Sequence, residues 1–110
     1  MSQTPEARFK EKLRKYLTRR GIFYSDIFQD GVHGKKGDPD IVACYRGCYI
    51  AFECKSATGS LKELQKLRRD QILASGGRHV KARNMEQVEN ILKEIDEELE
   101  RWQNQATTTP

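Results

Sequence analysis

The sequence predicts an α/β fold whose helices and strands follow in the order αβββαβα. Apolar residues recur every three or four positions near both ends of the chain, which is typical of amphipathic helices. Between these segments, two short apolar runs flank Arg46-Gly47, as in a hairpin. A chain of 110 residues suits one domain. We expect this domain over residues 1–104 and a disordered tail over residues 105–110.

The first helix is expected to begin after Thr4 and to stop at Gly21. Thr4 is a suitable N-cap, Pro5 suits the first turn, and Glu6 lies near the positive helix end. The apolar stripe comprises Phe9, Leu13, Tyr16 and Leu17. Glu6 extends this stripe toward the core side, so it is either an acid favoured at a helix start or a third carboxylate directed at a metal site.

The second and third strands are expected to pair across a two-residue turn at Arg46-Gly47. The paired positions are then Tyr45 with Cys48, Ala43 with Ile50, and Asp40 with Glu53. Opposed Cβ atoms lie about 5 Å apart, and side chains alternate between faces. Asp40, Glu53 and Lys55 therefore share one face, whereas the other face is apolar. A divalent cation between the two carboxylates would offset their repulsion.

The remaining elements are, in chain order, a strand over 22–28, a glycine-rich loop over 29–37, a helix from Ser60 to Ser75, a strand over 78–82, and a helix from Asn84 to about Gln103. Ser60 begins a capping-box pattern, and Gly76-Gly77 ends the helix that follows it. That helix has four apolar candidates, Leu61, Leu64, Leu67 and Leu73. The last helix carries a longer apolar stripe, whose far end allows a dimer contact.

The acidic and basic residues around the hairpin form the pattern Gly37-Asp38-Pro39-Asp40 followed by Glu53-Cys54-Lys55. This PD…ExK arrangement resembles the PD-(D/E)xK nuclease superfamily. With Gln65 on the next helix, the fuller pattern resembles the VRR-NUC (virus-type replication–repair nuclease) family of that superfamily. The resemblance covers the chain from about Glu6 to Val88. It implies a restriction-endonuclease-like core with a mixed sheet flanked by helices.

The resemblance also implies a metal-dependent DNA endonuclease that uses Mg²⁺ or Mn²⁺. Its metal ligands would be Asp40, Glu53 and the backbone carbonyl of Cys54, with Glu6 near a second ion or its water shell. Lys55 would orient or deprotonate the attacking water or stabilise developing negative charge, and Gln65 would position water or phosphate. Similar stand-alone proteins form homodimers like those of Holliday-junction resolvases, so branched DNA is the expected substrate.

The net charge of +4 is divided unevenly along the chain. Residues 1–83 hold 18 Lys and Arg against nine Asp and Glu, whereas residues 84–110 hold two against seven. A basic body predicts a polyanionic partner. The expected phosphate contacts are Lys35, Lys36, Lys62, Lys66 and Arg69. The chain has three cysteines, and we expect no signal peptide and no long apolar run, which favours reduced thiols and a cytoplasmic location. If the gene belongs to a phage, this would be the cytoplasm of a bacterial host. No membrane partner is expected.

Two other interpretations explain part of the pattern. The chain could be a non-catalytic nucleic-acid-binding module on the same fold, although such a module would not need Asp40, Glu53 and Lys55 together. Alternatively, the hairpin could be a purely structural ion-pair cluster in which lysines balance the two carboxylates. That interpretation leaves Gln65 and the basic body unexplained.

Overall fold

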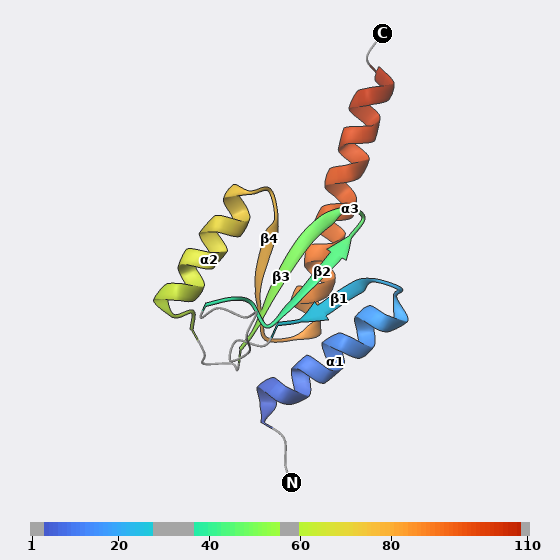
Figure 1. Cartoon of the computed structure of the whole chain (residues 1–110). Coiled ribbons are helices and arrows are strands. Elements are labelled where there is room, and N and C mark those ends of the chain that lie inside the picture. Colours follow the sequence, from blue (N-terminus) through green and yellow to red (C-terminus); the bar gives the residue numbers. More distant parts are fainter. Residues whose placement is uncertain (1–3, 28–36, 56–59, 109–110) are drawn as a thin grey trace.

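The computed structural model describes residues 4–27, 37–55 and 60–108, with side chains described as far as residue 105. Its elements are, in chain order, α1 (Pro5–Arg19), β1 (Phe23–Asp26), β2 (Ile41–Tyr45), β3 (Cys48–Cys54), α2 (Glu63–Ala74), β4 (Arg78–Ala82) and α3 (Met85–Thr108). The strands form one sheet in the order β1-β2-β3-β4 (Figure 1). The first three strands are antiparallel and β4 is parallel to β3, so the expected α/β fold with a mixed sheet and flanking helices is confirmed.

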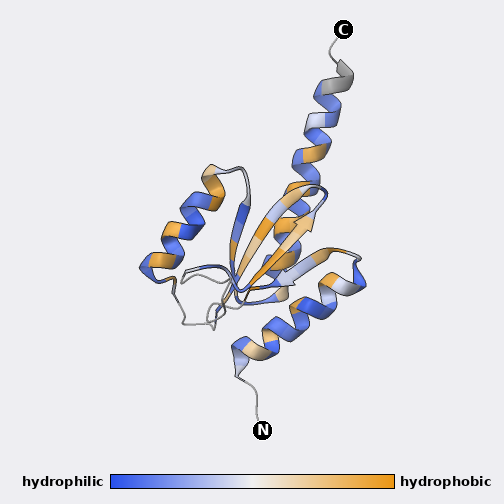
Figure 2. Ribbon diagram, viewed as in Figure 1, coloured by the Kyte–Doolittle hydropathy of each residue, from blue (hydrophilic) through white to orange (hydrophobic). Residues whose placement is uncertain are grey.

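Helices cover both faces of the sheet, with α1 and α3 on one face and α2 on the other (Figure 1). The core lies between the sheet and the pair α1 and α3, and its buried members include Leu13, Leu17, Ile41, Ile50, Phe52, Val88 and Leu92. Figure 2 shows the apolar residues concentrated on β2 and β3 and along the start of α3. The alternation of the hairpin strands therefore separates an apolar face from the face that α2 covers.

The β2–β3 hairpin has the predicted register, with Ala43 opposite Ile50 and Tyr45 opposite Cys48. Arg46 and Gly47 both have positive φ, 51° and 84°, as a two-residue primed turn requires. Asparagine is the usual residue at such a first position. Here the Arg46 guanidinium contacts the Asp96 carboxylate of α3 at 2.9 Å, which gives the side chain a role that asparagine could not fill.

Helix α2 differs most from the sequence prediction. It begins at Glu63 with Lys62 as its N-cap residue, so the predicted start at Ser60 is wrong. Its three leucines Leu64, Leu67 and Leu73 are 45%, 49% and 49% exposed, so they do not form the expected apolar face. The helix instead contacts the polar face of the sheet through Gln65 and Glu53, and its backbone at Leu64 packs against the segment before β2, where a Cβ added to Gly37 would be only 2.7 Å away.

Other boundaries shift by a few residues. Strand β1 ends at Asp26, and Phe28, the predicted end of that strand, lies outside the described residues. Asn84 caps α3 as predicted, since its Oδ1 accepts from the Gln87 N–H at 3.0 Å. Helix α3 continues to Thr108, beyond the predicted end at Gln103 and into the predicted tail. Within the described parts of the chain, no helix is both long and apolar enough to cross a membrane.

Candidate active site

Asp40 and Glu53 lie near each other where β2 begins and β3 ends. The Asp40 N–H donates to the carbonyl of Phe52, the residue already paired with Ile41, at 3.1 Å, so Asp40 lies just outside the regular β2–β3 ladder. Asp40 Oδ2 accepts from the Cys54 N–H at 2.8 Å, so the carboxylate is held against the edge of β3. The predicted pairing of Asp40 with Glu53 is therefore not part of the ladder, although the two carboxyl groups interact, since Asp40 raises the pKa of Glu53.

The Glu53 carboxyl group is completely buried, at 0% exposure, between the sheet and α2. The Gln65 amide Nε2 donates to Glu53 Oε2 at 3.2 Å. Glu53 Oε1 has no hydrogen-bond partner among the described residues. Burial raises the pKa of Glu53 to about 8, the Asp40 carboxylate adds to that rise, and the positive charge of Lys55 opposes it. Without a bound cation, Glu53 is therefore mostly protonated at neutral pH.

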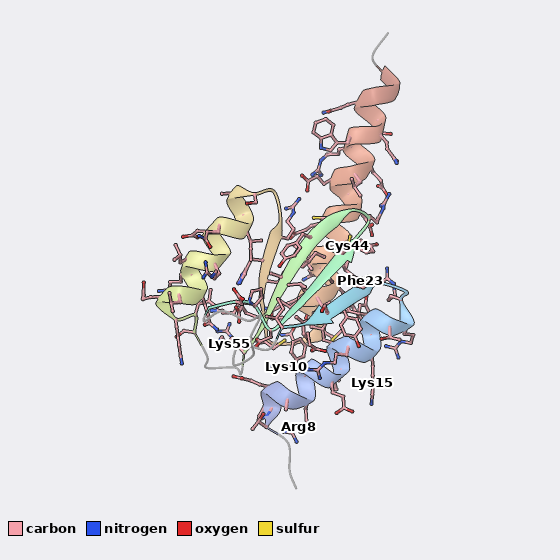
Figure 3. The ribbon with its side chains drawn as sticks, in the orientation of Figure 1. Arg8, Lys10, Lys15, Phe23, Cys44 and Lys55 are labelled. Carbon is pink, nitrogen blue, oxygen red and sulfur yellow. The ribbon has the colours of Figure 1, made fainter. Side chains whose placement is uncertain are left out.

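Two lysines contribute positive charge at this end of the sheet. Lys55 directly follows β3, and its charge acts on Glu53. Lys10 of α1 places its Nζ 3.3 Å from Asp40 Oδ1. Figure 3 shows both lysines near the end of the sheet where β3 finishes. Glu6 lies half-buried one turn before Lys10 and on the same side of α1. The start of α1 thus belongs to the site.

Lys10 and His79 are site residues that the sequence analysis did not identify. His79 lies on β4 opposite Ala51, so it shares the face of Glu53. Its side chain is 2% exposed, and its Nε2 is 4.0 Å from Glu53 Oε1. Burial, and then the charge of Arg69, lowers the pKa of His79. Alternation along β4 would have revealed His79 once β4 was known to be parallel to β3, and Lys10 is four residues after Glu6 on the same helix face.

The predicted phosphate contacts are only partly described. Lys35 and Lys36 lie outside the described residues. Lys62 is exposed at the start of α2. The other two predicted contacts on that helix, Lys66 and Arg69, have acidic partners. Lys66 Nζ lies 3.3 Å from Glu63 Oε1, and Arg69 Nη2 lies 3.1 Å from Asp70 Oδ1. Part of the positive charge of α2 is therefore neutralised by its own acids.

The residues of the site can be tested for their fit to a hard divalent cation. No group of three or more His, Cys, Asp or Glu side chains suited to a metal ion occurs in the described part of the chain. However, Mg²⁺ is commonly held by only one or two carboxylates and retains several waters. Asp40 and Glu53 provide two such carboxylates, and the unpartnered Glu53 Oε1 is a buried oxygen that a cation would satisfy. The donor set therefore fits Mg²⁺ or Mn²⁺.

Cys54 can contribute to such a site only through its backbone. Burial raises the pKa of its thiol to about 12, and the Asp40 carboxylate adds to this rise. The thiol is therefore neutral at physiological pH, and thiolate is the form that binds metals. Its carbonyl oxygen is left as the ligand that this residue could offer.

The arrangement as a whole combines paired acids, two ammonium groups and an amide at one end of a sheet. Such a group can hold a cation, orient water and balance negative charge on a bound anion. No protein-family model, curated protein or solved structure matches this chain.

Proposed function

We propose that this protein is a metal-dependent DNA endonuclease of the VRR-NUC type, on a PD-(D/E)xK core, that hydrolyses phosphodiester bonds. One observation carries the proposal. The residues of the sequence motif come from separate elements, yet they meet around one buried carboxylate, since Gln65 donates to Glu53 and both Asp40 and Lys55 act on the pKa of Glu53. The order of helices and strands supports the same assignment.

Asp40 and Glu53 would hold Mg²⁺ or Mn²⁺, together with the backbone carbonyl of Cys54. The bound ion would polarise the phosphate and lower the pKa of a coordinated water. Glu6, half-buried one turn before Lys10, would face a second ion or its water shell. The protein's own contribution is to keep two carboxylates close together despite their repulsion, through the Cys54 N–H on Asp40 and the Gln65 amide on Glu53.

Lys55 and Gln65 have different roles in this proposal. The Lys55 ammonium would stabilise negative charge that develops on the phosphoryl oxygens. Both polar atoms of the Gln65 side-chain amide make hydrogen bonds within the protein. Its Oε1 accepts from the Lys62 N–H at 3.0 Å, and its Nε2 donates to Glu53. Gln65 is therefore a positioning residue that connects the start of α2 to Glu53, and its expected role in positioning water or phosphate stays a prediction.

We further propose that the enzyme acts as a homodimer on branched DNA. One site cuts one strand in each binding event, whereas a two-fold pair of sites can cut two strands symmetrically. The far part of α3 projects beyond the sheet (Figure 1). On it lies Trp102, whose 67% exposure is unusual for a large aromatic side chain and makes it available to a second copy.

The test incubates the protein with labelled four-way-junction, flap and linear duplex DNA in Mg²⁺, Mn²⁺ or EDTA. We expect metal-dependent cutting that falls by about 100-fold or more in Lys55→Ala and Asp40→Asn. The matched controls Lys93→Ala and Asp70→Asn change exposed residues of the same types and should cut normally. DNA binding without cutting in any metal would reject the enzyme and favour the non-catalytic binding module.

Oligomeric state is measured separately by light scattering. A homodimer should have symmetric cuts across the junction, and Trp102→Ala should shift it toward the monomer. A monomeric wild-type protein at all concentrations that cut DNA would reject the dimer while leaving the endonuclease intact.

A further inference from the structure

Four basic residues form a straight line along the outer side of α1. They are Arg8, Lys12, Lys15 and Arg19, and we call them the basic stripe. Their spacing of four, three and four residues places them on one helix face. All four are exposed, and Figure 3 shows Arg8 and Lys15 extending from the side of α1 away from the sheet. At about 1.5 Å per residue the stripe is about 16 Å long.

Most of the charge on the basic stripe is not neutralised within the protein. Lys15 is 3.3 Å from Glu11. For Arg8, Lys12 and Arg19, no ion pair occurs with any described residue. Like charges four residues apart destabilise a helix, so Arg8 with Lys12 and Lys15 with Arg19 are unfavourable in the isolated chain. A bound polyanion would convert this repulsion into attraction.

The stripe borders two hollows between α1 and the beginning of α3. Their charged lining consists of the four stripe residues, Arg83 and a single acid, Glu89. Arg83 therefore extends the positive surface from α1 onto the chain that leads into α3. An extended, predominantly positive surface beside the candidate active site is the electrostatic pattern of a nucleic-acid contact.

The stripe and the candidate active site lie on opposite sides of the same helix. Lys10 contacts Asp40 from the inner side of α1. A helix with its side chains is about 10–12 Å wide, which is close to the width of about 12 Å of the major groove of DNA. A duplex with one strand at the site could thus present its other strand to the stripe.

We propose that the basic stripe binds the phosphate backbone of duplex DNA beside the active site. The choice of DNA as the polyanion rests on the proposed nuclease function. Phosphate contacts of this kind position the duplex and carry no sequence information. The stripe would therefore determine how the substrate lies on the enzyme, whereas the α2 residues expected from sequence would contribute less because acids accompany them.

The test compares two double variants that each remove two exposed charges from a helix. Lys12→Gln/Arg19→Gln changes the stripe, and Lys93→Gln/Arg101→Gln is the charge-matched control on α3. Binding of a fluorescein-labelled duplex of about 20 base pairs is followed by anisotropy in EDTA, so that no cutting occurs. Each lost phosphate contact should weaken binding about 8-fold at about 0.1 M salt. We expect about 60-fold weaker binding for the stripe variant and a salt slope smaller by about 2, with a change below about 3-fold for the control.

Equal weakening in both variants, or no weakening in the stripe variant, would overturn the proposal. So would stripe-dependent binding to anionic phosphatidylserine vesicles in the absence of duplex binding. Because the measurement needs no catalysis, its outcome is separate from that of the cleavage test. If the protein binds DNA through the stripe but never cuts, the stripe proposal stands and the nuclease proposal is rejected. If it cuts DNA but its binding does not depend on the stripe, the nuclease proposal stands and the stripe proposal is rejected.

Discussion

Glu53→Gln is the change that examines the site most directly, because it removes the charge and keeps the shape. In the metal-free protein, burial raises the pKa of Glu53 from 4.5 to about 8. The folded state therefore holds a proton that the unfolded chain releases. The stabilisation from this proton is fully present below pH 4.5, and it is lost as the pH rises through about 8. Wild-type protein should accordingly lose stability across this range.

The size of the effect follows from the two pKa values. A change from 4.5 to about 8 corresponds to about 4 to 5 kcal/mol of unfolding free energy. That is a large share of the roughly 5–15 kcal/mol by which domains are stable. Urea unfolding in EDTA at several pH values between about 5 and 9 would measure it, as the difference between wild type and Glu53→Gln. The difference cancels the contributions of the other titrating groups.

The exposed Glu97 provides the control, since Glu97→Gln removes an acid of the same type that is not buried. Its difference from wild type should be nearly constant with pH. Glu53→Gln should match wild type near pH 5 and exceed it in stability near pH 9. A difference for Glu53→Gln that is flat over this range would refute the reasoning, because it would mean that Glu53 ionises in the folded state as readily as in the unfolded chain.

Three further predictions concern the same structure. Glu53 must lose its proton to bind a cation, so the apparent Mg²⁺ affinity measured by calorimetry should rise nearly tenfold per pH unit below pH 7 and level off above about pH 8. An affinity that does not change with pH would exclude Glu53 as a ligand. Gly37→Ala should lower the free energy of unfolding in urea by at least about 3 kcal/mol, because φ is +87° and the new Cβ would lie 2.7 Å from the α2 backbone. Gly21→Ala, with φ +68° and open space around the new Cβ, should cost about 1–2 kcal/mol, and equal losses in the two variants would contradict the close approach at Gly37. Tyr45→Phe removes a 2.9 Å hydrogen bond to Asp96 and should cost about 1 kcal/mol in urea unfolding, with no effect on cutting.

The hairpin at the centre of the site could be predicted from the sequence because local rules determine it. A two-residue turn at Arg46-Gly47 and the period-two alternation together place Ile41 opposite Phe52, which brings Asp40 and Glu53 to the same end of the hairpin. The first helix could be predicted for the same reason, because Thr4 caps its start and Gly21, with a positive φ, follows its end. In each case the deciding interactions lie within a few residues of one another.

The parts that could not be predicted depend on contacts between distant elements. Leucine spacing suggested an apolar face on α2, but the helix lies over the polar face of β3, where Gln65 and His79 surround Glu53. The position of Lys10 beside Asp40 depends on how α1 packs across the sheet. Periodicity shows that a helix has faces, and it does not show which face of which strand they meet.

The burial of Glu53 also distinguishes between the interpretations that the sequence left open. In a structural ion-pair cluster, the partners of a buried acid hold its pKa down, because their charge offsets the loss of hydration. Here the opposite holds, since Lys55 and Lys10 oppose the rise in the pKa of Glu53 without cancelling it, and one carboxylate oxygen stays unpartnered among the described residues. A glutamine or an apolar residue at this position would stabilise the fold better at neutral pH. A carboxylate that lowers stability in the protein alone is understandable if its partner is a cation that binds from outside, and that is the condition that the proposed metal-dependent nuclease would supply.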